Sequence, residues 1–311
     1  MISRRIIRVK VMQLLYISET MYDGNSPKNA RIELRKAIDK SRSLLAFLLH
    51  NAIQIAKYSE VWAYSRANKN IVTEEDRNVN TKVAGNEVVW KLLENKSYQK
   101  LIEEEKPELI TDKADNEYIK KFFLELLETD IYKSYISEDG RIKKDEINIL
   151  SIIFNDLMLQ NENFISLCEE LFSNWDDDIE MLQQIILSIF QKPDKYNIDL
   201  LISDSKWQFA ISLLETVIDK KEHLMSLIVP KLKNWEADRI ALVDMIFIKM
   251  GIAELLYFDT IPTRVTLNEY IDLAKEYSSK QSSQFINGIM DAIHKELLAE
   301  GKIQKVSFVK K

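Results

Sequence analysis

The stretch "LRKAIDKSRSLLAFLLHNAIQIAKYSEVWAYS", from Leu34 to Ser65, decides the fold class. Its apolar residues recur at intervals of three and four, and cations lie between them. This spacing gathers the apolar side chains on one face of a helix, because a helix completes a turn every 3.6 residues. The residues that set the pattern are Leu34, Ile38, Leu45, Leu48, Leu49, Ala52, Ile55 and Ala56. A long amphipathic helix is therefore expected here.

The rest of the chain shows the same helical spacing, and no stretch shows sustained alternation typical of a strand. The 311 residues include only six glycines and five prolines, whereas a sheet protein needs many turns and turns use these residues. The sequence therefore predicts an all-α protein. Polar breaks between the expected helices fall at residues 23–29, 68–82, 105–116, 137–141 and 192–199.

Charge is distributed unevenly along the chain, although its formal net value is only −6. Residues 1–100 contain 18 Lys and Arg against 10 Asp and Glu, whereas residues 101–180 contain 8 against 22. Residues 181–311 balance at 17 against 17. This asymmetry permits an anionic partner at the basic front, and a basic partner at the acidic middle.

No motif of a known catalytic class is visible. No glycine-rich phosphate-binding loop is present, and the three histidines, His50, His223 and His294, are scattered. Cys168 lies on an apolar stripe, which favours a core position over a role as nucleophile. We therefore expect a protein that is not an enzyme and that uses neither a cofactor nor a metal ion.

The sequence also favours a cytoplasmic protein without a membrane segment. The longest apolar run, residues 44–49, is far shorter than a membrane-spanning helix. Gln13 interrupts the apolar part of the N-terminal stretch, so no signal peptide is expected. The single cysteine excludes an internal disulfide.

A weak internal similarity appears at an offset of 60 residues. "FISLCEELFSNWDDDIEMLQQII" resembles "LMSLIVPKLKNWEADRIALVDMI". The matched positions include Asn174, Trp175 and Asp178 in the first copy, and Asn234, Trp235 and Asp238 in the second. Two copies are too few for a solenoid, so the similarity indicates at most a duplicated helical pair.

The C-terminal third predicts two helices with clear punctuation. Thr266 and Glu269 have the spacing of a capping box, and Ser282 or Ser283 can cap the next helix after the break "SSKQSS". Gly288 lies inside that second helix, where glycine costs about 1 kcal/mol relative to alanine. Either a close helix contact or a contact with a ligand would account for it.

These residues resemble the NusB family of bacterial transcription antitermination factors. The resemblance covers about residues 3–20 and 200–298 and includes "DRIALVDMIFIKMGIAELLY" and the arginine-rich "RRIIRVKVMQLLY". In the C-terminal part, the matching residues are Pro262, Arg264, Val265, Asn268, Glu269, Leu273, Ala274, Lys275, Phe285, Ile286, Asn287 and Gly288. The resemblance implies a NusB-like helical bundle, and the family's usual size is about half that of this chain.

An additional inserted helical region is therefore expected after the first helix. On this interpretation residues 1–24 contain the RNA-binding first helix and residues 25–175 form the insertion. Residues 176–300 form the C-terminal core of the bundle, and residues 301–311 form a basic tail.

The resemblance implies that Arg4, Arg5 and Arg8 bind a short single-stranded RNA element called boxA. Arg4 and Arg8 lie one turn apart on one face of a helix. Val9, Gln13 and Tyr16 point elsewhere, so the arginines are not expected to need burial. Clustered arginines attract phosphates and stack on bases, and positive charge at a helix N-terminus opposes the helix dipole. Lys10 joins this set on charge grounds alone. A merely solvated basic helix start is the alternative.

A second RNA surface is expected around Lys280, Gln281 and Asn287. By resemblance, the protein partner is NusE, a small-subunit ribosomal protein, within the RNA polymerase antitermination complex during rRNA transcription. Its expected contacts are Glu236, Asp238 and Arg239, because acidic groups suit a basic ribosomal protein.

Two other functions compete with this prediction. One is a helical protein–protein adaptor without RNA binding, whose acidic middle holds a basic partner. The other is a remnant of an RNA-modifying enzyme, since some RNA methyltransferases carry a NusB-like domain. The absence of a glycine-rich cofactor loop argues against the enzyme.

Overall fold

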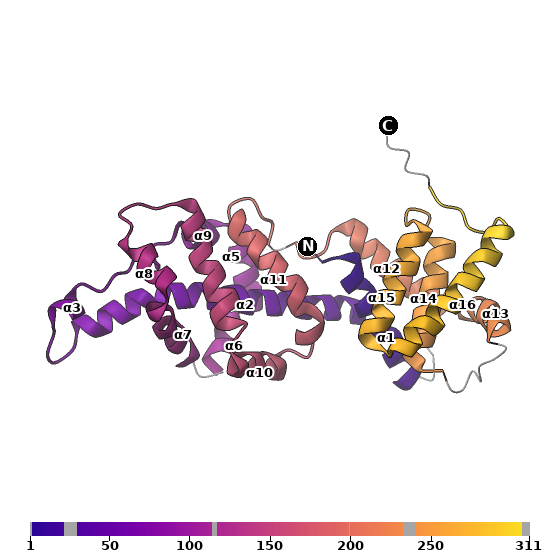
Figure 1. The fold of residues 1–311 in the computed structure, drawn as a ribbon, viewed down its shortest axis with the longest axis horizontal. Coiled ribbons are helices and arrows are strands. Elements are labelled where there is room, and N and C mark those ends of the chain that lie inside the picture. The colour runs from indigo at the N-terminus through magenta and orange to yellow at the C-terminus, as the bar shows by residue number, and fades with distance from the viewer. Residues whose placement is uncertain (1, 22–29, 114–116, 199, 233–239, 307–311) are drawn as a thin grey trace. The chain divides into compact units, whose positions relative to one another are not determined.

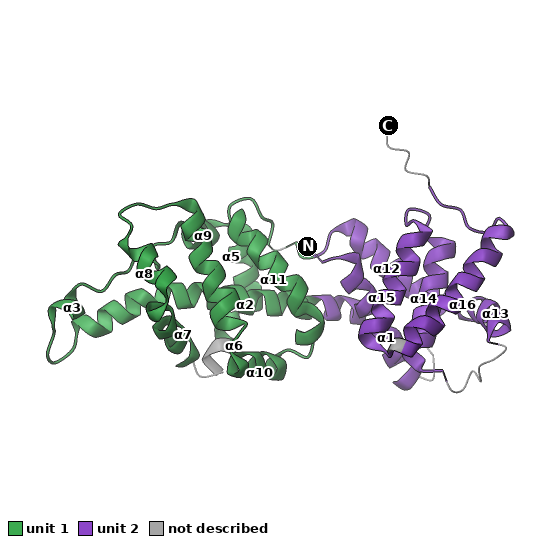
Figure 2. Cartoon of the chain, in the orientation of Figure 1, with its two compact units in different colours: residues 1, 39–201 green, residues 2–38, 202–311 purple. Residues whose placement is uncertain are grey.

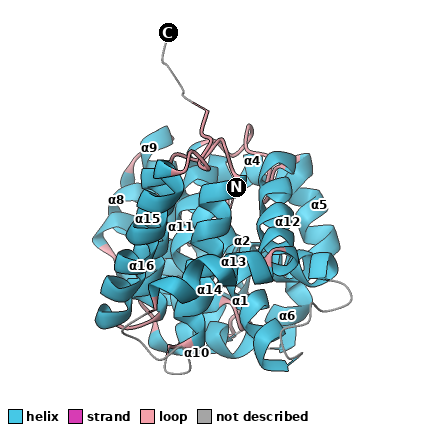
Figure 3. Ribbon diagram, turned by 90° about the vertical axis from the view of Figure 1, so that its right-hand side faces the viewer, coloured by secondary structure: helices cyan, strands magenta, loops and turns pink. Residues whose placement is uncertain are grey.

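The computed structural model describes residues 2–21, 30–113, 117–198, 200–232 and 240–306. Every regular element within these ranges is a helix (Figures 1 and 3), which confirms the all-α prediction. Among the described helices, none combines the length and apolar character needed to cross a membrane.

The chain divides into two compact units (Figure 2). Apart from the first residue, unit 1 is residues 39–201, and unit 2 is residues 2–38 with residues 202–311. Unit 1 contains 20 Lys and Arg against 31 Asp and Glu, a formal net charge of −11. Unit 2 contains 23 against 18, a net charge of +5. The charge asymmetry of the sequence is thus an asymmetry between two folded bodies.

Unit 1 is a set of mostly short helices arranged along one long helix. The predicted helix over residues 34–65 is present within α2, which spans Ala30–Ala67 and begins in unit 2. The other elements are α3 (Glu74–Arg77), α4 (Glu87–Glu94), α5 (Lys96–Glu105), α6 (Pro107–Lys113), α7 (Glu117–Glu128), α8 (Asp130–Ser137), α9 (Lys143–Ile152), the π-helix η1 (Ile153–Met158), α10 (Glu162–Leu171) and α11 (Trp175–Gln191).

Aromatic rings fill the centre of unit 1. Phe47 of α2 stacks on Phe164 of α10 with ring centroids 6.2 Å apart, and Phe122 of α7 meets Phe164 edge-on at 5.6 Å. Cys168, one helical turn after Phe164, is fully buried, which confirms its predicted core position. Burial raises the pKa of its thiol far above the ordinary value, so the unreactive form dominates at neutral pH.

The first copy of the internal similarity ties α11 to α2. The buried Asp178 carboxylate accepts hydrogen bonds from Ser41 at 2.6 Å and from Asn174 at 2.5 Å. The Asn and Asp of this pattern therefore hold α11 against α2, and Asn174 makes no side-chain cap at the start of α11. Asn234, Trp235 and Asp238 of the second copy lie outside the described residues.

The units divide at positions that differ from the expected boundaries. Helix α11 packs against α9 and α10 in unit 1, whereas the sequence assigned residues from 176 onward to the C-terminal core. The first part of α2, residues 30–38, belongs to unit 2 although the sequence placed it in the insertion. Packing partners, which local spacing does not specify, decide both assignments.

Unit 2 is a helical bundle around a central helix. Its elements are α1 (Arg4–Met21), α12 (Asp204–Asp219), α13 (Lys221–Ile228), the 3₁₀ helix η2 (Val229–Lys231), α14 (Leu242–Tyr257), α15 (Thr263–Tyr277) and α16 (Lys280–Ala299), beside the start of α2. Helix α14 contacts α1, α12, α13, α15 and α16 and is buried on every face. Its apolar sequence, broken by few polar residues, suits this central position.

Gly251 allows the close approach of α14 and α16. A Cβ atom at this position would lie 2.3 Å from the Cε atom of Met290 on α16, and Met290 is fully buried. An added side-chain atom would therefore displace the end of the Met290 side chain. The absence of a side chain at Gly251 therefore leaves room for Met290 between the two helices.

The segment that follows α16 returns to the end of α14. The Lys305 ammonium donates hydrogen bonds to the carbonyl oxygens of Glu254 at 2.9 Å and Phe258 at 2.6 Å. These carbonyls belong to the last turn of α14, where positive charge complements the helix dipole. Burial lowers the pKa of Lys305. Part of the predicted basic tail thus caps a helix.

Acid is expected to weaken unit 2 through Glu19 of α1. Burial opposes its ionisation, but the hydrogen bonds and charges of Lys249 and Lys221 outweigh burial and lower the pKa of Glu19. A lowered pKa stabilises the fold above the unfolded-state pKa of about 4.3, and this contribution disappears as pH falls through the folded-state pKa. Glu19→Gln should cost about 1–3 kcal/mol at pH 7, because Lys249 is buried.

Urea unfolding of the wild type and of Glu19→Gln at pH 7 and pH 3 measures this contribution. The difference between the two proteins should shrink at pH 3. Asp291→Asn is the control, because the ion pair of Asp291 with Lys295 is exposed. An equal difference at both pH values would contradict the prediction.

Candidate nucleic-acid interface

Arg8 lies in a buried cluster of unit 2, so the expectation that it needs no burial is wrong. Its side chain is 2% exposed. Nε and Nη2 donate to the two carboxylate oxygens of Glu254 on α14, both at 2.9 Å. Nη1 donates to Glu269 on α15 at 3.0 Å. Every nitrogen of the guanidinium therefore has a partner within the bundle.

Glu254 is the centre of this cluster. Its carboxylate is fully buried and also accepts hydrogen bonds from Thr266 at 2.8 Å and from Tyr270 at 3.2 Å. Burial alone would lower the pKa of Arg8, but Glu254 and Glu269 raise it above its usual value. Burial and the charge of Glu254 raise the pKa of Tyr270. Arg8 is consequently charged and Tyr270 neutral at physiological pH.

The predicted capping box is wrong for the same reason. Helix α15 begins at Thr263 with Pro262 at its N-cap position, so Thr266 and Glu269 lie one turn inside the helix. Their side chains bind Glu254 and Arg8 instead of the backbone of α15. The spacing typical of a capping box here belongs to two side chains that bind residues of other helices.

Lys10 is also buried, at 2% exposure, and is therefore no surface cation. Helix α1 packs against both α12 and α14, and burial extends to most residues between Ile7 and Leu15. A helix enclosed on several sides buries cations as well as apolar residues, provided that each finds a partner. The accessible cations of α1 are thus restricted to its N-terminal tip.

Arg4 and Arg5 form this tip. Arg4 is exposed, and its guanidinium carbon lies 5.5 Å from the centre of the Phe209 ring of α12. Arg5 pairs with Glu276 of α15 at 2.6 Å, and its side chain is 36% exposed. Glu276 comes just before the residues that connect α15 to α16. This ion pair therefore joins the tip of α1 to the end of α15, four residues before the second predicted RNA surface begins, although Arg5 and Glu276 are 271 residues apart in sequence.

The second predicted surface lies on α16. This helix begins at Lys280, and Ser279 caps it by accepting a hydrogen bond from the Ser282 backbone, so the predicted cap at Ser282 or Ser283 is wrong by one turn. Gln281 is exposed on the first turn, and the side chain of Lys280 lies outside the described residues.

Asn287 and Gly288 are exposed on the same helix. A Cβ atom at Gly288 would meet no described atom within 4 Å, so the expected close helix contact is absent from the part of the chain that the structure describes. The other explanation of this glycine, contact with a ligand, remains a prediction. Glu236, Asp238 and Arg239, the expected partner contacts, lie outside the described residues.

One cation at the tip escaped the sequence reasoning. The ammonium of Lys206 on α12 donates to the carbonyl oxygen of Ile2 at 2.6 Å, two residues before Arg4. Lys206 is 204 residues from Ile2, and no local pattern links them. The available signal was its position on the first turn of α12, which begins at Asp204. A cation at the start of one helix can lie near the start of another helix in a bundle.

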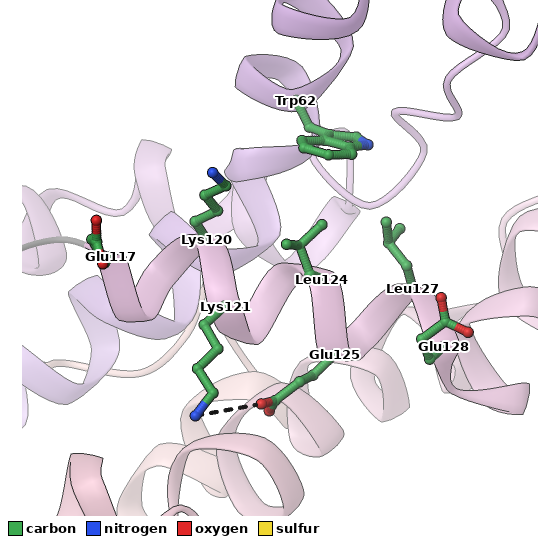
Figure 4. Close-up of a pocket in the computed structure, with 8 residues that line it drawn as sticks. All are labelled: Trp62, Glu117, Lys120, Lys121, Leu124, Glu125, Leu127 and Glu128. Carbon is green, nitrogen blue, oxygen red and sulfur yellow. Dashed lines mark ion pairs between the residues drawn. The ribbon is translucent and has the colours of Figure 1, made fainter.

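Unit 1 contains a groove of about 660 Å³ between the end of α2 and α7 (Figure 4). Leu124 and Leu127 of α7 point toward Trp62 of α2, whereas Lys121 and Glu125, which pair at 3.9 Å, point away from Trp62 on the other side of α7. The groove offers apolar contact between charges of both signs. Among the described residues, no cluster of His, Cys, Asp or Glu has a metal-binding arrangement.

The sequence profile of the NusB family matches residues 170–295. The transcription antitermination protein NusB of Chloroherpeton thalassium is 37% identical over 97 residues, which are 31% of this chain and 46% of that protein. The transcription antitermination protein NusB of Listeria monocytogenes is 38% identical over 96 residues, which are 31% of this chain and 75% of that protein. No solved structure matches the chain.

The matched region covers α12 to α15 and most of α16, together with α11 of unit 1. It contains Glu254 and Glu269, the two carboxylates that hold Arg8 of the first helix in place. Three quarters of the Listeria protein thus has its counterpart here, while most of unit 1 lies outside the match. The chain belongs to the NusB family and carries an additional helical unit.

Proposed function

We propose that this protein is a transcription antitermination factor that binds single-stranded boxA-type RNA together with NusE. The names of its curated relatives support the antitermination role. The observation that supports RNA binding is the tip of α1, where Arg4 is exposed and Arg5 reaches the end of α15, in a unit with a net charge of +5. The proposed role is cytoplasmic and involves no catalysis.

Within this proposal the predicted RNA-binding residues have different roles. Arg4, Arg5, Gln281 and Asn287 are accessible to RNA. Arg8 is a positioning residue, because its bonds to Glu254 and Glu269 hold α1 against the bundle. Lys280 stays in the RNA set as a prediction from its position on the first turn of α16. Lys10 is withdrawn from direct contact because it is buried.

NusE remains the proposed protein partner, and the RNA polymerase antitermination complex during rRNA transcription remains the proposed setting. The contacts with NusE are assigned to Glu236, Asp238 and Arg239 as a prediction. The adaptor function is the second candidate, because unit 1 combines a net charge of −11 with an apolar groove. Those features suit a basic protein partner.

RNA binding should weaken when the tip of α1 loses its arginines. In the double variant Arg4→Ala with Arg5→Ala, the log–log salt slope of binding should fall by about 1.4. This value corresponds to roughly 0.7 for each phosphate contact with a single strand. The measurement is a fluorescence titration of a boxA-like RNA across a salt series, with and without NusE.

The control is Lys91→Ala with Lys133→Ala, which removes two exposed cations from unit 1. Its slope should equal that of the wild type. Wild-type protein that binds no RNA, even with NusE present, would favour the adaptor. An unchanged slope in the arginine variant would move the RNA site away from α1.

A further inference from the structure

Two cations that have no acidic partner among the described residues meet beside the tip of α1. The Lys206 ammonium lies on the Ile2 carbonyl, and Arg4 follows two residues later. Among the described residues, neither Arg4 nor Lys206 forms an ion pair, in contrast to Arg5 and Arg8. Burial and the positive charge of Arg4 both lower the pKa of Lys206. A bound anion would relieve this repulsion.

A planar cation, the guanidinium of Arg35, lies over the residue that follows Lys206. Trp207 follows Lys206 on α12, and the guanidinium carbon of Arg35 on α2 lies 3.9 Å from the centre of the Trp207 ring. Arg35 is exposed, and Trp207 is half-buried. A guanidinium at this distance stacks on the indole, which restricts its motion.

A second contact holds this part of α2 beside α12. Arg31, one turn before Arg35, donates two hydrogen bonds to Glu215 at 2.5 and 3.0 Å. Glu215 lies two turns after Trp207 on α12, so the two contacts align the helices in opposite directions. The Trp207 ring and the Arg31–Glu215 ion pair therefore restrict the position of the Arg35 guanidinium.

We propose that Arg35, stacked on Trp207, is a stacking site for a base of single-stranded RNA, and that Arg4 and Lys206 hold an adjacent phosphate. This inference rests on the proposed function and extends the RNA path from α16 across the tip of α1 to α12 and α2. Bases of single-stranded RNA stack on arginine planes and aromatic rings, while cations hold the backbone. A planar cation next to two cations that form no ion pair within the described ranges matches this combination.

The test separates stacking from charge in titrations of a single-stranded RNA of 12 nucleotides across a salt series. Arg35→Lys keeps the charge and removes the plane, so binding should weaken about 5- to 100-fold with an unchanged salt slope. Trp207→Phe keeps a ring and should stay within a few-fold of the wild type. Lys206→Ala should lower the slope by about 0.7.

Two controls accompany these variants. Trp90→Ala removes an exposed tryptophan of unit 1 and should bind like the wild type. Inorganic polyphosphate has phosphates but no bases. In the absence of RNA it should therefore bind the wild type and Arg35→Lys with equal affinity. Far-UV circular dichroism and urea unfolding confirm that each variant is folded, and Arg35→Lys changes only an exposed side chain.

The outcomes distinguish this inference from the proposed function. Wild-type protein that binds no RNA would overturn both. Normal RNA binding that depends on Arg4 and Arg5 but is indifferent to Arg35→Lys would overturn the stacking site alone. Weakening by Arg35→Lys of polyphosphate binding as well as RNA binding would show a charge effect and would also overturn it.

Discussion

Replacement of Arg8 by alanine is expected to lower the free energy of unfolding by about 3–5 kcal/mol. The change removes three hydrogen bonds and leaves the fully buried carboxylate of Glu254 without its cation. Thr266 and Tyr270 still donate to Glu254, but neither carries a positive charge. Urea unfolding followed by circular dichroism measures the loss.

Arg5→Ala is the matched control, because it removes an arginine from the same helix. Its ion pair with Glu276 is exposed on both sides and should contribute less than about 1 kcal/mol. If Arg8→Ala is as mild as Arg5→Ala, the buried cluster does not stabilise the bundle. A double variant at Arg8 and Glu254 separates the loss of the charge pair from the loss of packing around the Arg8 side chain.

The double variant Arg8→Met with Glu254→Gln should recover much of the lost stability. Methionine fills the volume of the arginine stem, and glutamine keeps one of the two oxygens that accept from Thr266 and Tyr270. The amide NH2 replaces the other oxygen and donates, so the hydroxyl that faces it must turn to accept. The same variant tests the role of Arg8 toward RNA. If Arg8 only positions α1, the double variant binds RNA with a wild-type salt slope, whereas a slope lowered by about 0.7 would indicate direct phosphate contact.

Phe164→Ala is expected to destabilise unit 1 by about 3–5 kcal/mol. Its ring is buried and lies between Phe47, Phe122 and Tyr118 at centroid distances of 5.6 to 6.2 Å. Removal of the ring leaves a cavity among rigid aromatic neighbours, which have little freedom to close it. The measurement is again the free energy of unfolding in urea.

Leu171→Ala on the same helix is the control, because Leu171 is exposed and should cost less than about 1 kcal/mol. Combination of Phe164→Ala with Arg8→Ala tests the division into two units. Sites without shared partners add within about 0.5 kcal/mol. A larger deviation would contradict the independence of the two cores, and a mild Phe164→Ala would contradict the prediction itself.

The helices were predictable because their spacing is local. Residues 34–65 form one helix as expected, and Cys168 lies in the core as its apolar neighbours indicated. The burial of Arg8 was not predictable by the same reasoning. Its partner Glu254 is 246 residues away, and the spacing within α1 contains no information about that distance.

The same limit explains the errors in the C-terminal third. Thr266 and Glu269 have the spacing of a capping box, yet their partners are Glu254 and Arg8 on other helices. Three serines near the start of α16 are chemically equivalent as caps, and only the path of the backbone selected Ser279. No local pattern in the sequence of α11 indicates that it packs in unit 1 and not in unit 2. The RNA-binding residues stay predictions.

The separation of Arg8 from Glu254 also has a consequence in time. A ribosome adds about 5–20 residues per second, so the 246 residues between them take roughly 12–50 s to synthesise. All of unit 1 is completed within this interval, because residues 39–201 precede Glu254. During synthesis the first helix is therefore complete, with Arg5 and Arg8 still lacking Glu276 and Glu254, throughout the time in which the chain of the acidic unit is made.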